Sequence, residues 1–376
     1  MDPTAPPPLR RFVFPFLFVV ALFVTLVVRR PEPVPEPIEE EVWVLEGQAM
    51  GTTYAVKVVP GESSVDMKGA EAVAEAADAA IQRVNTRLST YSKLSELSQF
   101  NTLQSSEAIS ISTDFSVVVS WGLELFEKSG GAFDVTIGPL INLWGFGPDK
   151  DKSPPTGDEV KAALERIGSQ YLELSKDGLQ LSKSRVDLYV DLSAIAKGYG
   201  VDEMGRAIES LGYTRYLVEV GGEVLTKGNG AGGRPWRIGL ETPDGGAQDI
   251  ESTVALEGAL ATSGNYRNFK MVKGKRVAHT MDPRTGAQVE HSLASVSIIS
   301  DTCMEADGWA TALLVMGEQE GLKVAEAEGI AARLLVGDAD GNFSVVESTR
   351  WKQRTAVKKH SPNPDSVVAP EGIQGE

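Results

Sequence analysis

Hydrophobic and polar residues alternate along several short stretches of the chain, a pattern typical of half-buried β-strands. Residues 42–59, VWVLEGQAMGTTYAVKVV, alternate on both sides of Gly51 and predict two paired strands. A shorter apolar run around Leu188 and Val190 predicts a strand that ends at Asp191. Further strands are predicted near residues 214–220, 223–227, 236–241, 253–261, 293–299 and 342–346.

Helical spacing and capping residues predict helices between these strands. The predicted helices cover residues 66–88, 113–128, 156–167, 196–211 and 302–316. Two of them begin at a capping box, formed by Thr156 with Glu159 and by Thr302 with Glu305. Because the helices and strands follow no regular βαβ order, we expect an α+β fold.

An uncharged apolar run near the N-terminus, residues 12–28, lies between two pairs of arginines. As a helix it is long enough to cross most of a hydrocarbon layer of ~30 Å, and no small-residue cleavage site follows it. We therefore expect residues 1–30 to form an uncleaved membrane anchor, and the Pro/Glu-rich residues 31–41 to form an extended spacer. A globular domain at residues 42–350 follows, and residues 361–376 are expected to be a disordered tail. Because arginines flank both ends of the run, they do not decide its orientation.

The composition excludes several kinds of partner and site. The formal net charge is −16 and no basic patch is present, so no nucleic acid partner is expected. The single cysteine, Cys303, rules out an internal disulfide. With only 3 histidines in the chain, a bound metal ion would have to be held by oxygen ligands.

Two motifs resemble ligand-binding sequences but lack a feature that binding requires. GNGAGG at residues 228–233 fits the dinucleotide-binding fingerprint, but the strand-like segment RPWRIGL follows it where a helix is required. DADGN at residues 338–342 resembles the start of an EF-hand loop, but Thr349 stands where the bidentate glutamate is required. We interpret the second motif as a hairpin turn.

Four segments far apart in the sequence each combine glycine or proline with isolated polar residues. They are SGGAFDVTIGPL (129–140), VDLSAIAKGYGVD (190–202), HTMDPRTG (279–286) and MEADGWATALLVMG (304–317). Glycine lets a backbone turn sharply or approach a ligand closely. Each segment also has a structural explanation, as a helix cap, a turn or a packed core segment.

Two of these segments suggest ligand binding. Lys197 and Gly198 begin a predicted helix directly after the strand that Asp191 ends, so backbone N–H groups there could face an anion. Asp307 and Thr311 are four residues apart on a predicted helix, so their oxygens point to one face. Magnesium often takes only one or two carboxylates from a protein, although such a pair is also common on a solvated helix face.

Together, these segments closely resemble the FAD:protein FMN transferases of the ApbE family. The resemblance also includes MGTTY (50–54), STYSKLSELSQFN (89–101) and ALATSGNYRNF (259–269). It implies a tunnelling-like α+β fold with FAD bound between two halves. It also implies transfer of FMN from FAD to a threonine or serine of an acceptor protein, through a phosphoester bond, with release of AMP. The acceptors of the family are subunits of membrane electron-transport or sodium-pumping complexes and other extracytoplasmic flavin carriers.

The resemblance also assigns roles to residues of this chain. The expected FAD contacts are Met50, Tyr91, Ala132, Phe133, Asp134, Asp191, Lys197 and Met281. The expected magnesium ligands are Asp307, Thr311 and the backbone carbonyl of Ala194. His279 is expected to accept the proton of the acceptor hydroxyl, since an unperturbed imidazole titrates near pH ~6.5; alternatively, it only hydrogen-bonds the turn at Asp282.

Two other functions remain open on the sequence alone. An FAD pyrophosphatase would use the same metal site with water as the nucleophile, and a non-catalytic flavin carrier would need the FAD contacts without Asp307 and Thr311. The anchor and the family together imply a single-pass protein of the bacterial inner membrane, with its catalytic domain on the periplasmic side.

Overall fold

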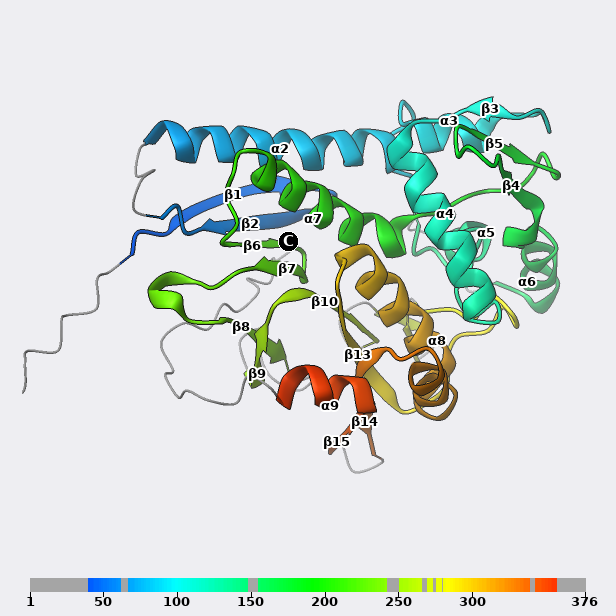
Figure 1. Ribbon diagram of the computed structural model, residues 1–376. Helices are drawn as coiled ribbons and strands as arrows, with labels where there is room; N and C mark the ends of the chain where they lie inside the picture. The colour runs from blue at the N-terminus through cyan, green and yellow to red at the C-terminus, as the bar shows by residue number, and fades with distance from the viewer. Residues whose placement is uncertain are drawn as a thin grey trace, which may run out of the picture. The chain divides into compact units, whose positions relative to one another are not determined.

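The computed structural model describes residues 40–61, 67–147, 155–241, 250–265, 269–272, 275–278, 280–338 and 342–356 (Figure 1). The expected membrane anchor, most of the spacer, the expected tail and His279 lie outside these residues. Within the part of the chain that the structure describes, no helix is long and apolar enough to span a membrane. The residues from Glu40 onward belong to one compact unit.

The largest sheet of the described residues has eight antiparallel strands in the order β1–β2–β6–β7–β10–β13–β14–β15. Its strands are β1 (Trp43–Ala49), β2 (Thr52–Val58), β6 (Tyr216–Val220), β7 (Glu223–Lys227), β10 (Gly258–Gly264), β13 (Leu293–Ser300), β14 (Ala331–Gly337) and β15 (Phe343–Glu347). The pairing of β14 with β15 confirms the hairpin predicted at residues 338–342. The sequence pattern did not predict β14 itself.

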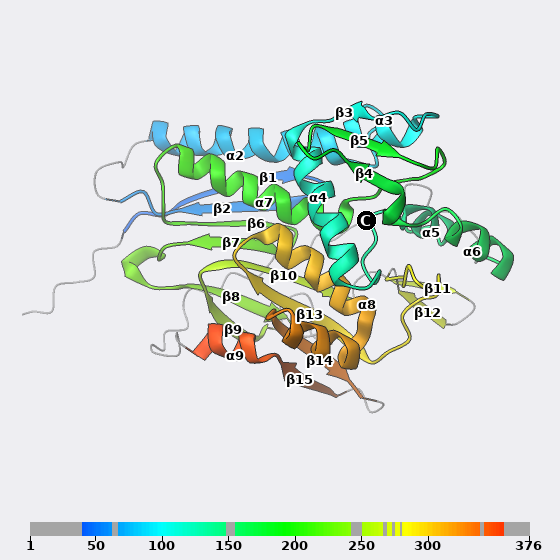
Figure 2. The same cartoon turned by 45° about the vertical axis from the view of Figure 1, so that its right-hand side comes forward.

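Both faces of this sheet are covered. The covering elements are α2 (Met67–Leu88), α7 (Ser193–Ser210), α8 (Cys303–Ala327), α9 (Thr349–Ala356), β8 (Trp236–Glu241) and β9 (Ile250–Leu256). The helices α2, α7 and α8 lie side by side over one face (Figures 1 and 2), and the β8–β9 hairpin with α9 covers the other. Successive residues of β6 face opposite ways: Leu217 packs in the cluster of Trp236, and Val218 in the cluster of Ile81.

A second group of elements packs against α7 and α8 through helix α4. The group contains α3 (Glu96–Thr102), α4 (Thr113–Lys128), α5 (Gly138–Leu143), α6 (Gly157–Leu164), β3 (Ile109–Ser110), β4 (Leu172–Leu174) and β5 (Gln180–Lys183). The remaining elements are the hairpin β11 (Phe269–Val272) with β12 (Lys275–Ala278) and two short 3-10 turns, Ser169–Tyr171 and Ala231–Gly233. Helices thus combine with antiparallel strands, as expected for an α+β fold.

Met50 and Gly51 form the tight turn between β1 and β2. Ala49 pairs with Thr52, so the loop has two residues, and both have positive φ angles, 53° and 76°. These are the angles of a type I′ turn, which matches the twist of a hairpin. Met50 is the only non-glycine residue with positive φ in the described part of the chain, so a residue expected to contact FAD lies in a strained conformation.

Two predictions near Asp191 are wrong. Residues 188–190 form no strand, because the Asn101 side chain bonds both the N–H and the C=O of Val190, each at 2.8 Å, in place of a neighbouring strand. Helix α7 begins at Ser193 rather than Ala196, since Asp191 Oδ1 accepts the Ser193 N–H over 2.9 Å. The next turn of the helix therefore contains Lys197.

Helix α8 runs past its expected end at Met316 and is interrupted at Gly317, where φ is 80° and ψ is −179°. His291 fits against the interruption: its Nε2 donates to the Leu314 carbonyl over 2.8 Å. A Cβ atom on Gly317 would lie 2.7 Å from the His291 ring. The histidine thus satisfies a carbonyl at the break, and the helix continues to Ala327.

Candidate active site

Helices α7 and α8 cross so closely that their backbones touch. A Cβ atom on Gly198 would lie 2.4 Å from the Cys303 carbonyl oxygen, so only glycine fits there. Across this crossing, the Gly198 N–H donates to Asp307 Oδ2 over 3.1 Å. The anionic group that this N–H faces is therefore a carboxylate of the protein itself, Asp307.

A carboxylate of α7 also caps the beginning of α8. Asp202 accepts the backbone N–H groups of Cys303 over 2.7 Å and of Met304 over 3.0 Å. Burial raises the pKa of Asp202 to about 6, although these two hydrogen bonds oppose the shift. Thr302 adds the predicted N-cap, whereas Glu305 bonds Ser300 instead of closing the capping box.

Lys197 lies between two buried carboxylates at this crossing. Its Nζ is 2.8 Å from Glu223 Oε1 and 3.9 Å from Asp307 Oδ1. Both carboxylate residues are 4% exposed, whereas 31% of the Lys197 side chain is exposed. Burial alone would lower the pKa of Lys197, but the charges of Asp307 and Glu223 outweigh it and hold that pKa above its ordinary value. Burial and the nearby charge of Glu223 raise the pKa of Asp307, although the charge of Lys197 opposes the shift.

Glu219 is a further partly buried acid near this cluster. Burial and the nearby charge of Glu223 raise its pKa to about 7, although a hydrogen bond from Gly222 lowers it. That bond runs from the Gly222 N–H to Glu219 Oε1 over 2.6 Å. Asp307, Glu219 and Glu223 thus outnumber the single ammonium group of Lys197, and this excess of carboxylates favours binding of a cation.

The three residues expected to hold magnesium present only oxygen donors. Asp307 offers a buried carboxylate, and Thr311 one turn later offers a hydroxyl that lies 3.2 Å from the Ser263 hydroxyl. Ala194 is in the first turn of α7, the helix that crosses α8 beside Asp307. Among the described residues no group of three or more His, Cys, Asp or Glu is placed to hold a metal. A single carboxylate with neutral oxygens fits magnesium, which completes its shell with water and phosphate.

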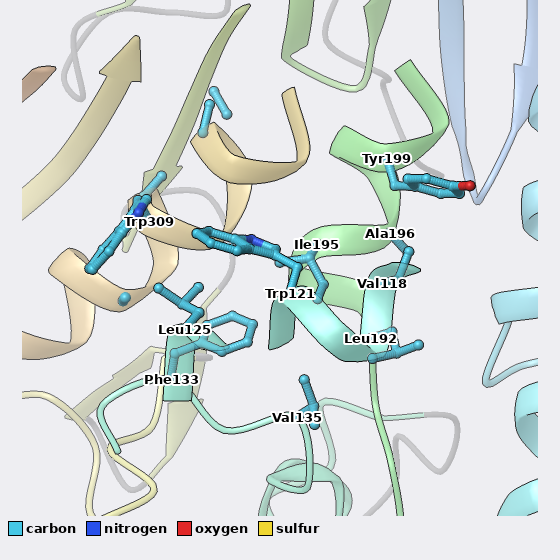
Figure 3. Close-up of a cluster of buried hydrophobic side chains, with 14 of the residues drawn as sticks. Val118, Trp121, Leu125, Phe133, Val135, Leu192, Ile195, Ala196, Tyr199 and Trp309 are labelled. Carbon is cyan, nitrogen blue, oxygen red and sulfur yellow. The ribbon is translucent and has the colours of Figure 1, made fainter. Parts of the chain in front are cut away.

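The GAFD segment is buried beside the same helices. Ala132 and Phe133 are 1% and 4% exposed, and Phe133 shares a cluster with Leu125 of α4 and Trp309 of α8 (Figure 3). The Asp134 carboxylate accepts hydrogen bonds from the backbone and hydroxyl groups of both Thr136 and Ser169. Asp134 therefore holds its own loop together, and a contact with FAD stays a prediction.

The four motif segments, distant in sequence, lie against one another. The Asp191 N–H donates to the Val135 carbonyl over 2.6 Å, which joins the first two segments. A Cβ atom on Gly131 would lie 3.7 Å from Arg284 Cγ, so the third segment adjoins the first. The fourth, on α8, meets the second through Gly198 and Asp307.

The remaining expected FAD contacts differ in exposure. Tyr91 is 66% exposed on the loop between α2 and α3. Met50 is half-buried, and a Cβ atom on Gly200 of α7 would lie 3.4 Å from its sulfur. Met281 is 1% exposed and packs with Leu140 of α5. Their contacts with FAD stay predictions.

Glu223 and Asn101 are site residues that the sequence analysis missed. Glu223 begins a strand of the main sheet directly after two glycines, and its only sequence signal is that it is one of two acids, with Glu219, in the otherwise apolar run VEVGGEV. Asn101 belongs to the STYSKLSELSQFN segment, but nothing local indicates that it pairs with Val190. The contact of Glu223 with Lys197 and that of Asn101 with Val190 each join residues far apart in sequence.

Comparison with known proteins decides the family. A family model described as the ApbE family matches residues 50–334. The chain belongs to the ApbE family. The resemblance seen in its motifs is thereby confirmed, and all of the motif segments of the ApbE chain described above lie within the matched region.

Curated relatives cover most of the ApbE chain. The FAD:protein FMN transferase of Haemophilus influenzae is 40% identical over 327 residues, which cover 85% of this chain and 94% of that protein. The enzyme of the same name from Vibrio cholerae is 41% identical over 310 residues, which cover 82% and 91%. Both matches thus cover more than four fifths of this chain and more than nine tenths of the relative.

Solved structures show the same fold. The flavin transferase ApbE from Vibrio cholerae superposes with a TM-score of 0.76 at 40% identity, and the match covers 83% of this chain and 99% of that one. The apo form of the Pseudomonas stutzeri flavinyl transferase ApbE gives a TM-score of 0.76 at 34% identity, covering 85% and 98%. The ApbE fold of this chain is therefore established.

Proposed function

We propose that this chain is an FAD:protein FMN transferase. The observation that carries the proposal is its 40% identity, over 94% of the relative's length, to a protein of that named activity. The reaction breaks the bond between the FMN phosphorus of FAD and the bridging oxygen of its pyrophosphate. The oxygen of an acceptor threonine or serine forms the new bond to the FMN phosphorus, its proton passes to a base, and AMP leaves.

Asp307, Thr311 and the Ala194 carbonyl would hold magnesium in this protein. When bound, the ion supplies positive charge that offsets the negative charge of the pyrophosphate. The crossing of α7 and α8 supports this role, because it fixes Asp307 through the Gly198 N–H. Lys197 adds a partly exposed ammonium beside Asp307, where it can attract a phosphate oxygen.

The flavin would be held by the motif segments that meet around α7, between two halves of a tunnelling-like fold. Tyr91 presents an exposed ring, which suits stacking against a flavin. The other proposed contacts are Met50, Ala132, Phe133, Asp134, Asp191 and Met281. His279, outside the described residues, is proposed as the base that accepts the hydroxyl proton.

The acceptor and the location follow from the same proposal. The acceptor would be a flavin-carrying subunit of a membrane electron-transport or sodium-pumping complex. Residues 12–28 would anchor the chain in the bacterial inner membrane, with the catalytic domain on the periplasmic side.

Mass spectrometry of an acceptor domain tests the function directly. After incubation with this chain, FAD and magnesium, the acceptor should gain the mass of an FMN phosphoester on one threonine or serine, with one AMP released per acceptor. AMP release at the same rate without acceptor would instead indicate a pyrophosphatase. FAD binding without AMP release in either case would indicate a flavin carrier.

A further inference from the structure

One ammonium group is shared unequally by two buried carboxylates. Lys197 Nζ is 2.8 Å from Glu223 Oε1, which is a charge-assisted hydrogen bond, but 3.9 Å from Asp307 Oδ1. The lysine side chain is flexible and ends in a compact charge with three donors. The two acids are equally buried, at 4% exposed each, so burial does not explain the preference.

The backbone around Glu223 explains why it holds the lysine. Gly221 and Gly222, with φ angles of 59° and 107°, form the tight turn between β6 and β7. Glu223 is the first residue of β7 and pairs with Val220 across this turn. Its position is therefore set by the sheet, independently of α7 and α8.

The second oxygen of Glu223 shows that the carboxylate has little other structural use. Glu223 Oε2 is buried and has no hydrogen-bond partner among the residues that the structure describes. A buried carboxylate oxygen without a hydrogen-bond partner is costly, so an acid at this position costs the fold free energy. The bond to Lys197 is the interaction that remains.

We propose that Glu223 is a positioning residue that keeps the Lys197 ammonium away from Asp307, so that Asp307 stays free to bind a divalent cation. In the cation-free protein, Lys197 supplies the positive charge that two buried carboxylates need. When a cation binds Asp307, Glu223 still neutralises the lysine. The inference rests on the proposed magnesium site at Asp307.

Removing the Glu223 charge should therefore weaken cation binding. In Glu223→Gln the amide keeps the size of the side chain but no longer holds the ammonium by charge, so Lys197 moves onto Asp307. The Mn²⁺ dissociation constant of the full-length chain in detergent should rise between ~10-fold and ~100-fold, the range typical of substitutions in the outer shell of a metal site. Electron paramagnetic resonance of free Mn²⁺ measures this without any reaction.

A second substitution distinguishes positioning from a merely structural role. Glu223→Gln combined with Lys197→Met removes the competing ammonium and should restore Mn²⁺ affinity to within about threefold of wild type, since energetically coupled partners are non-additive. Glu219→Gln is the matched control, because this nearby acid bonds Gly222 and not the lysine. Circular dichroism and thermal melting confirm that each variant is folded.

Each result supports or overturns the inference. Weaker binding in Glu223→Gln with recovery in the double variant supports it. Suppose that Asp307→Ala abolishes Mn²⁺ binding, so that the metal site is where we propose it. Unchanged Mn²⁺ affinity in Glu223→Gln, or no recovery of affinity in the double variant, then overturns the inference about Glu223. If wild type and Asp307→Ala bind Mn²⁺ alike, the proposed metal site itself is wrong and the inference falls with it.

Discussion

The backbone N–H of Gly198 donates a hydrogen bond to the Asp307 carboxylate over 3.1 Å, across the crossing of α7 and α8. The contact needs the two helices to touch, and this is possible because residue 198 has no side chain. The same crossing brings Lys197 of α7 to within 3.9 Å of Asp307. The close packing of two helices therefore builds the charged part of the site.

Gly198→Ala should disrupt this crossing. The added Cβ would lie 2.4 Å from the Cys303 carbonyl, so the helices must separate, at a cost of about 1–3 kcal/mol in the free energy of unfolding. Urea unfolding measures the loss, and Mn²⁺ affinity should fall with it. Gly157→Ala is the control: a Cβ there meets nothing within 4 Å, so stability should not decrease. Equal stability of both variants would contradict the close crossing.

Asp307→Asn should abolish magnesium-dependent FMN transfer while the protein stays folded. The asparagine oxygen can still accept the Gly198 N–H, so the crossing is kept, but the charge that binds the cation is lost. Because a metal contributes several kcal/mol to such a reaction, we expect the rate to fall by more than ~100-fold. Acceptor flavinylation at varied magnesium measures it. An unchanged magnesium dependence would move the ion to another acid, and Glu305 would be tested first.

The stability of the folded protein should decrease as pH rises, because of Glu219. Its pKa is about 7 in the folded protein instead of the ordinary 4.5, so the folded state binds this proton more tightly than the unfolded chain. As pH rises from 4.5 to 7 the unfolded chain releases its proton first, which lowers the free energy of unfolding by up to about 3 kcal/mol. Glu219→Gln should remove this loss.

Urea unfolding of wild type and Glu219→Gln at pH 4.5 to 8.5 tests this prediction. The variant should become more stable relative to wild type as pH rises. Glu159→Gln is a control of opposite sign, since hydrogen bonds from Thr156 lower the pKa of Glu159. At pH values above the ordinary glutamate pKa, Glu159→Gln should instead be less stable than wild type. Parallel pH profiles for Glu219→Gln and wild type would refute the shift.

Local signals in the sequence were sufficient for much of the fold. The capping box at Thr156 and Glu159 forms as predicted, because its hydrogen bonds lie within one helical turn. The turn at Gly51 also forms as predicted, since two alternating segments flank a residue that accepts positive φ. In both cases the contacting residues are close in sequence.

Contacts between distant residues could not be predicted in this way. Val190 looks like part of a strand by its apolar neighbours, but its hydrogen bonds go to Asn101, 89 residues away. Likewise the sequence indicates a cation-binding Asp307 on α8, but Glu223, which holds Lys197 beside it, lies on a strand of the sheet. Helical spacing and the family resemblance both indicated Asp307, whereas Glu223 is seen only in the structure.

Asp134→Ala should destabilise the protein. Its carboxylate accepts the N–H groups of Thr136 and Ser169, and each buried donor left without an acceptor costs about 1–3 kcal/mol. Urea unfolding should show a loss of about 2–4 kcal/mol in total. Asp177→Ala is the control, because Asp177 makes a similar turn with Ser175 and Leu179 on an exposed loop. Full stability together with lost FAD affinity would show that Asp134 contacts FAD instead.

His279→Asn tests the proposed base. A positioned base typically contributes ~10²- to 10⁴-fold to the rate, so turnover should fall by that order while FAD affinity, measured by fluorescence titration, stays near that of wild type. Asparagine keeps some hydrogen bonding, so a histidine that only shapes the turn before Asp282 would give the reverse result. FAD binding or stability would then weaken, and turnover at saturating FAD would be nearly normal.

The pH dependence separates these two roles of His279 further. A neutral imidazole is needed to accept the proton, so the wild-type flavinylation rate should fall as pH drops below the reference imidazole pKa of ~6.5. Rates between about pH 5.5 and 8.5 span that value. In His279→Asn no imidazole titrates at this position, so the acid limb should disappear along with most of the rate. Identical profiles in the two proteins would eliminate His279 as the base and leave the proton to water or to another group of the site.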